Sequence, residues 1–181
     1  TDWSWSVLSQ DYDLDGWPDI FISNGYRREV TDLDYIQFTD DSINRLYGGI
    51  SPKYFKTIYE YLDLIPSVKI RNYMLRNKGD LTFENKTIDW GFTDKTFSNG
   101  AAYADLDNDG DLDLVVNNIE SEALVYRNTA AETKKGAWLE LHVEGPRGNP
   151  NGIGTLARIT SGGKSWQQEL TPVRGFFSCN E

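Results

Sequence analysis

The chain has 181 residues, of which 39% are hydrophobic and 13% aromatic, so it can bury a core as one domain or two small ones and is not a disordered acidic chain. Its net charge of −10 disfavours nucleic acid and anionic membrane surfaces as partners. No apolar run approaches the ~18 residues that a transmembrane helix needs, and the single cysteine, Cys179, cannot form an internal disulfide bond.

A β-strand is predicted at the start of the chain, because Trp3, Trp5 and Val7 alternate with serines and therefore share one face. The sequence starts at Thr1 with neither an initiator methionine nor a signal peptide. We therefore interpret it as part of a longer protein.

An acidic loop follows this strand. Carboxylates occupy its positions 1, 3, 5 and 9, with Gly16 at position 6 and Trp17 at position 7; the acids are Asp11, Asp13, Asp15 and Asp19. Alternating carboxylates on a tight turn bring several oxygens together and repel one another without a cation, and this set of hard oxygen donors suits Ca²⁺. The glycine permits the positive φ that such a turn needs. The loop therefore predicts a calcium site, to which Trp17 would contribute its backbone carbonyl.

The apolar run 20–22 after the loop distinguishes this site from other calcium loops. An EF-hand requires a bidentate glutamate at position 12 and flanking helices. Position 12 is Ile22 here, inside a run typical of a strand. Thrombospondin-type and dockerin-type repeats also want an acid at this position. We therefore predict a loop between two β-strands, closed by a turn at Ser23-Asn24-Gly25.

A helical insertion is predicted at about residues 28–70. Its first half predicts a helix from Thr31 through Phe38, with Asp40-Asp41 as a potential interruption and an end at Gly48-Gly49. Its second half has a capping serine and a first-turn proline at Ser51-Pro52, and Pro66 ends this helix.

The second predicted helix carries an aromatic stripe at helical period, and two interpretations of it stay open. The stripe either packs on the flank of the domain or binds a partner. Trp17, in the first acidic loop, is a further candidate because the following proline favours an extended backbone that can hold the indole outward. The candidate binding residues are Trp17, Tyr54, Tyr59 and Tyr61.

A hairpin with Gly79-Asp80 in its turn is predicted after the insertion. The chain then reaches a second acidic loop with the same register, in which Gly110 stands at position 6 and the apolar Val116 at position 12. Position 7 would again give its backbone carbonyl, leaving the side chain of Asp111 free. The residues predicted to bind the second Ca²⁺ ion are Asp105, Asp107, Asp109, Asp111 (through its carbonyl) and Asp113.

The loop pattern Asp-x-Asp-x-Asp-Gly-x-x-Asp, followed by an apolar strand and Asn117-Asn118, resembles the FG-GAP/VCBS repeats of integrin-type β-propellers. The resemblance implies that each repeat is roughly one four-stranded blade, with calcium in the hairpin loop between two strands. Arg76 lies 65 residues after Asp11, whereas the matching Arg127 lies 22 residues after Asp105. The first repeat therefore contains about 43 additional residues, and these are the predicted insertion. The segment Asn24–Asp34 resembles one found in Bacteroidetes-type members.

Residues 129–136 are small and polar and are predicted to link the repeats, in residues 1–128, to a small β domain in residues 137–181. In this domain we predict a strand over 139–143 and a hairpin around Gly162-Gly163. The domain resembles the start of an ASPIC/UnbV domain, as in cartilage acidic protein-like proteins, but it departs from that pattern at residues 154–158. His142, between two glutamates, is predicted to lie on a solvated face rather than in a transition-metal site.

Together these patterns predict a mainly β chain: partial β-propeller blades with two Ca²⁺ sites in hairpin loops, a helical insertion and a small C-terminal β domain. Loops of this kind stay filled outside the cytosol, where calcium is plentiful. The predicted function is a non-catalytic extracytoplasmic module that binds a protein or glycan. The alternative is a scaffold portion of a secreted glycan-active or other hydrolytic enzyme, which would need a carboxylate pair with a raised pKa in a cleft.

Overall fold

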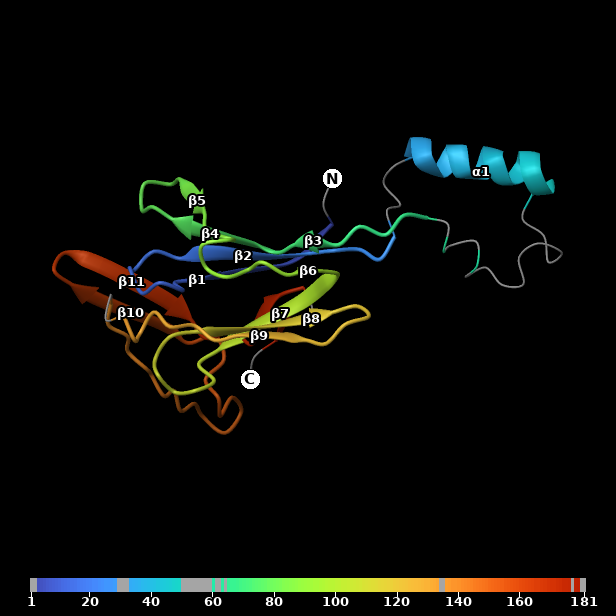
Figure 1. Cartoon of the computed structure of the whole chain (residues 1–181). Helices are drawn as coiled ribbons and strands as arrows, with labels where there is room; N and C mark the ends of the chain where they lie inside the picture. The colour runs from blue at the N-terminus through green and yellow to red at the C-terminus, as the bar shows by residue number, and fades with distance from the viewer. Residues whose placement is uncertain are drawn as a thin grey trace.

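The computed structural model describes residues 3–28, 33–49, 60, 63, 65–133, 136–176 and 178–179. This described part is mostly β, with one helix and several antiparallel sheets (Figure 1). The predicted mainly β class is therefore confirmed. The sheets within the described ranges do not close into a propeller.

The first sheet has four strands in the order β1 (Ser4–Gln10), β2 (Asp19–Asn24), β4 (Tyr73–Asn77) and β5 (Phe83–Asn85). All three neighbouring pairs are antiparallel. The predicted turn between β4 and β5 is confirmed: the amide of Lys78 donates a hydrogen bond to the carbonyl of Thr82 at 3.0 Å, and Gly79 has a φ of 77°. The four strands thus follow one another in chain order, with the insertion between β2 and β4.

The second sheet repeats the beginning of this arrangement with three antiparallel strands: β7 (Ser98–Ala104), β8 (Asp113–Asn118) and β9 (Leu124–Tyr126). A short ladder between β3 (Ile70–Arg71) and β6 (Lys95–Thr96) joins the segments that lead into β4 and β7. Each acidic loop therefore connects the first two strands of its sheet, as the sequence predicts.

The main hydrophobic core lies between the two sheets. Its fully buried members from the first sheet are Leu8, Phe21 and Met74, and β7 and β8 contribute the remaining strand residues, Ala101, Tyr103, Leu114 and Val116. The loop residues Tyr12 and Phe92 complete the cluster. Alternate residues of β2 and β8 face this core, because successive side chains of a strand point to opposite sides. The core holds both acidic loops at the same end of the two sheets.

A buried polar network links the two sheets at the end away from the acidic loops. The Asn24 amide donates to the Oδ1 atom of Asn72 at 2.8 Å, and the Nδ2 atom of Asn72 donates to the Ser98 hydroxyl at 3.0 Å. The same hydroxyl donates to the Oδ1 atom of Asn118 at 2.7 Å. All four residues are buried, and buried polar groups are stable when they are hydrogen-bonded in this way.

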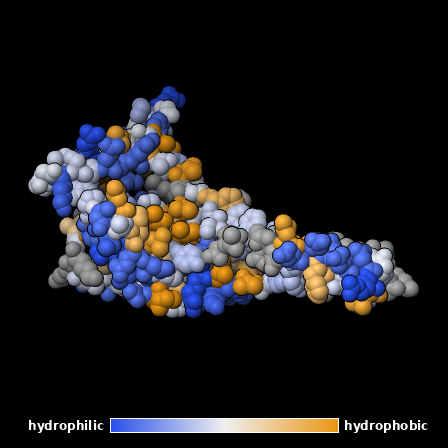
Figure 2. Space-filling view, turned by 90° about the horizontal axis from the view of Figure 1, so that it is seen from above, coloured by the Kyte–Doolittle hydropathy of each residue, from blue (hydrophilic) through white to orange (hydrophobic). Residues whose placement is uncertain are grey.

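The helix α1 (Leu33–Tyr47) extends away from the sheets (Figures 1 and 2). It ends at Tyr47, directly before the predicted stop at Gly48, and the φ of Gly48 is 71°. The interruption considered at Asp40-Asp41 is wrong, because α1 runs through both residues. Aspartate is a weak helix former but costs only a fraction of a kcal/mol at an exposed position. The second half of the insertion lies almost wholly outside the described residues, and so do Tyr54, Tyr59 and Tyr61.

The C-terminal part contains the predicted hairpin, formed by β10 (Leu156–Ser161) and β11 (Lys164–Glu169), and a short pair, β12 (Val173–Gly175) and β13 (Ser178–Cys179). The strand predicted at 139–143 is wrong: this segment has no regular secondary structure. An alternating pattern needs a partner strand to form a ladder, and none of the described strands pairs with it. The predicted domain boundaries at 128 and 137 stay predictions.

Candidate metal centre

The two acidic loops have the same backbone conformation. Each begins after the last residue of one strand and ends where Asp19 or Asp113 starts the next. Position 4 is left-handed in both loops, with φ values of 58° at Leu14 and 59° at Asn108. Position 6 is also left-handed, with φ values of 90° at Gly16 and 96° at Gly110, which explains the glycine found there. The repeated sequence thus encodes a repeated shape.

The hydrogen bonds inside the loops also repeat. Asp11 accepts the amides of positions 5 and 6 at 3.1 and 2.8 Å, and Asp105 accepts the corresponding amides at 3.1 and 3.0 Å. The position 5 carboxylate accepts the amide of position 7, at 2.9 Å for Asp15 and 3.1 Å for Asp109. These bonds hold the carboxylates of positions 1 and 5 in place within each loop.

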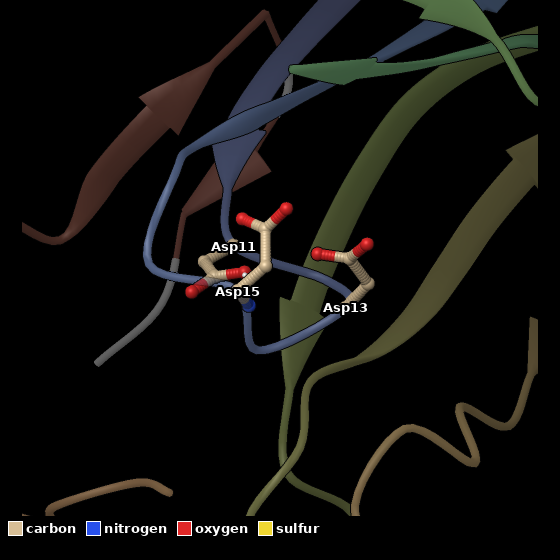
Figure 3. Close-up of side chains that lie close together, drawn as sticks. All are labelled: Asp11, Asp13 and Asp15. Atoms are coloured by element: carbon tan, nitrogen blue, oxygen red, sulfur yellow. Dashed lines mark hydrogen bonds between the residues drawn. The ribbon is translucent and has the colours of Figure 1, made fainter. Parts of the chain in front are cut away.

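Three carboxylates converge in each loop: Asp11, Asp13 and Asp15 in the first (Figure 3), and Asp105, Asp107 and Asp109 in the second. One oxygen from each residue of a triad lies within 4.8 Å of the others. The Oδ1 atom of Asp13 and the Oδ2 atom of Asp109 are buried without a hydrogen-bond partner. A buried, unpartnered carboxylate oxygen is unfavourable unless a cation approaches it. Both triads therefore fit a hard cation such as Ca²⁺.

Asp19 and Asp113, at position 9, lie outside these triads. Asp19 is fully buried and accepts the amides of Tyr12 at 3.0 Å and Asn77 at 2.8 Å. Asp113 accepts the corresponding amides of Leu106 and Asn128 at 2.9 and 2.8 Å. Their role as metal ligands stays a prediction, since the structure shows them binding the loop to the third strand of the sheet.

Burial raises the pKa of Asp19 to about 7, although its two backbone donors lower it. This is the kind of perturbed acid that an enzyme would use. The side chain of Asp19 is, however, fully buried. The raised pKa is a consequence of packing at the strand end.

Position 7 differs between the loops, and the carbonyl ligation predicted for Trp17 and Asp111 stays a prediction. The Trp17 side chain is 44% exposed and lies over Gly79. The sequence analysis predicted a free side chain for Asp111, and this is wrong: the side chain is fully buried. One of its oxygens accepts the amide of Ala131 at 2.8 Å, and the other has no hydrogen-bond partner. Burial, the largest cause, and nearby carboxylates such as Asp109 raise the pKa of Asp111.

Two arginines contact the triads, and the sequence analysis did not identify them as part of the site. The Nε atom of Arg76, in β4, lies 2.5 Å from the Oδ2 atom of Asp13, and its Nη2 atom lies 2.7 Å from Asp15. Arg127, directly after β9, pairs in the same way, with Nε 2.7 Å from Asp107 and Nη2 3.8 Å from Asp109. The signal was available, because the dipeptide Arg-Asn occurs at matching positions of the two repeats, at the end of β4 and directly after β9.

The tryptophans of the C-terminal part were also missed. The Trp138 indole lies against Gly110, where a Cβ atom would overlap it, and the Trp166 indole lies near Gly16, where a Cβ atom would stand 3.1 Å from Nε1. Each loop glycine therefore has an indole beside it. Trp166 and Trp17 also line a cleft of about 550 Å³ with Leu139 and Ile159. His142 is solvated, and its Nε2 atom lies 3.9 Å from Glu144.

A family model described as an FG-GAP-like repeat matches residues 63–116, from the end of the insertion to β8 and including the second loop. No curated protein and no solved structure matches the chain significantly. The resemblance of the C-terminal part to an ASPIC/UnbV domain has no support from these comparisons. Among the helices that the structure describes, none is long and apolar enough to cross a bilayer. No feature of the described residues indicates nucleic-acid binding.

Proposed function

We propose that this chain is part of a calcium-binding β-propeller module that acts outside the cytosol, binds a protein or glycan and catalyses no reaction. The main support for the proposal is that the two loops share the same backbone conformation, hydrogen bonds and carboxylate triads. An accidental acidic cluster has no reason to recur with the same geometry. The FG-GAP-like match over the second loop supports the same interpretation, because such repeats are typical of extracellular adhesion-type propellers.

Both triads have the donors to hold Ca²⁺: Asp11, Asp13 and Asp15 in the first loop, and Asp105, Asp107 and Asp109 in the second. The carbonyls of position 7 would add a ligand to each site. A bound Ca²⁺ ion would supply the positive charge that three neighbouring carboxylates lack. The loop would then hold its two strands together at a lower electrostatic cost.

The first sheet supports the propeller assignment, because its four antiparallel strands follow one another as in a propeller blade. The second sheet has the same first three strands and packs against the first through their shared core. Propeller blades are stabilised by such contacts between neighbours. Of the four predicted binding residues, Trp17 is the one that the structure describes, and its side chain is exposed at the first loop.

Isothermal titration calorimetry of the whole chain with Ca²⁺ tests this function. We expect uptake of two ions by the unmodified protein and of one by the Asp107→Ala variant. Asp41→Ala, on the exposed surface of α1, is a matched control that should still bind two. No calcium uptake, or uptake that Asp107→Ala leaves unchanged, would refute the metal assignment.

A further inference from the structure

The charge around the first triad includes a cation that belongs to the protein. Three carboxylates carry three negative charges, and the guanidinium of Arg76 contacts two of them. Its Nε and Nη2 atoms form a fork that matches two acceptor oxygens, a geometry that lysine cannot reproduce. With Arg76 included, the net charge of the triad is −2, which one divalent cation would neutralise.

Arg76 does not close the first loop to a metal ion. It contacts the Oδ2 atom of Asp13, whereas the Oδ1 atom of the same carboxylate stays buried without a partner. One carboxylate can therefore contact the arginine through one oxygen and a metal ion through the other. In such an arrangement the arginine changes the electrostatic potential at the site without replacing a ligand.

The second loop has the matching arginine but a different charge. Arg127 is shared, because its Nη2 atom lies 2.5 Å from Glu132 and 3.8 Å from Asp109. Asp111 places a further carboxyl group in the second loop, fully buried and with an unpartnered Oδ1 atom. Because Arg127 is divided between the loop and Glu132, it offsets less of the negative charge of the second loop than Arg76 offsets in the first, although both loops have the same backbone.

We propose that Arg76 sets the charge selectivity of the first loop, so that this loop prefers a divalent to a trivalent cation more strongly than the second loop, where Glu132 shares Arg127. This inference rests on the proposed calcium binding. It assigns a role in the first site to Arg76, which does not itself bind the ion. Removing one positive charge next to a site strengthens trivalent binding more than divalent binding, because the repulsion scales with the charge of the ion.

The affinities of Ca²⁺ and Tb³⁺ test the proposal, measured by calorimetry in an Asp107→Ala background so that only the first loop binds. We expect Arg76→Met to increase the preference for Tb³⁺ over Ca²⁺ about tenfold, for a unit charge a few ångströms from the site. Arg76→Lys keeps the charge and should stay close to the unmodified ratio. Arg27→Met removes a surface arginine paired with Glu120 and should change nothing.

The second loop supplies an internal comparison in an Asp13→Ala background. Glu132→Gln leaves Arg127 to the loop carboxylates alone, so the preference for Tb³⁺ should fall toward that of the first loop. Urea unfolding of each variant shows that the fold is retained.

Three results would overturn the inference. If Arg76→Met weakens the binding of both cations by one common factor, the arginine is only a structural support. Arg76→Lys could shift the ratio as much as Arg76→Met, which would make geometry rather than charge decisive. Binding by the unmodified chain but not by its Asp107→Ala variant would show that the first loop holds no ion. If the unmodified chain binds neither cation, the proposed function fails together with the inference.

Discussion

The contact between Trp138 and Gly110 predicts that alanine at position 110 destabilises the fold through both backbone strain and steric conflict. Comparison of three glycines can separate these two effects. Gly91, Gly16 and Gly110 have nearly the same φ, at 88°, 90° and 96°. A Cβ atom at Gly91 would meet no atom within 4 Å. At Gly16 it would stand 3.1 Å from Trp166, and at Gly110 it would overlap the Trp138 indole. Alanine at the three positions therefore combines the same backbone strain with increasing steric conflict.

The expected losses of unfolding free energy follow from these contacts. A left-handed non-glycine residue costs about 1–2 kcal/mol, which is the whole effect expected at Gly91. Gly16→Ala should cost slightly more, because the indole must shift by a few tenths of an ångström. Trp138 is 52% exposed, so its displacement at Gly110 exposes up to ~100 Å² of apolar surface, worth about 2.5 kcal/mol in addition.

Urea unfolding followed by circular dichroism, with saturating Ca²⁺, measures these losses. We expect Gly110→Ala to be the most destabilised variant and Gly91→Ala the least. In a Trp138→Ala background, the cost of Gly110→Ala should fall to that of Gly91→Ala, because the overlapping side chain is gone. Equal costs at all three glycines, or no effect of the Trp138→Ala background, would refute the packing of the indole on the loop.

Three further outcomes are expected. Chelation with EDTA should lower the melting temperature markedly, because the carboxylates of each loop keep more negative charge than the neighbouring arginine offsets and repel one another; an unchanged melting curve would contradict this. Asn72→Ala should cost about 2–4 kcal/mol in urea unfolding, because it leaves the Asn24 amide without an acceptor and the Ser98 oxygen without one of its donors; a loss below 1 kcal/mol would count against the buried network. Trp17→Ala with Tyr61→Ala should weaken partner binding in pull-down assays while calcium uptake survives, and unfolding of this variant would instead make the two aromatic residues part of a core.

Local sequence patterns were sufficient for the elements that depend on neighbouring residues. The apolar strands around each loop, the glycine at position 6 and the end of α1 before Gly48 follow from hydrophobic alternation and backbone preference. The hairpin turn at Gly79 follows from the same rules. These features need no knowledge of the rest of the chain.

Features that depend on distant partners could not be predicted in this way. Arg76 meets Asp13 only because β4 lies beside β2 across the insertion. The burial of Asp111 depends on the segment at Ala131, which covers it. The segment 139–143 has the alternation of a strand but pairs with none of the described strands, since alternation indicates which face is apolar and not which strand lies beside it. Long-range pairing decided each of these outcomes.

Because of the buried network of Asn24, Asn72, Ser98 and Asn118, the two ends of the sheets should open at different free energies. It joins the sheets at one end, whereas the acidic loops lie at the other. Solvent can enter at the loops by local opening, but separation at the network breaks several buried hydrogen bonds at once. In native-state hydrogen exchange, the amide of Asn24 should therefore exchange only with global unfolding. The amides of Asp15 and Asp109 should exchange earlier and become slower when Ca²⁺ is present.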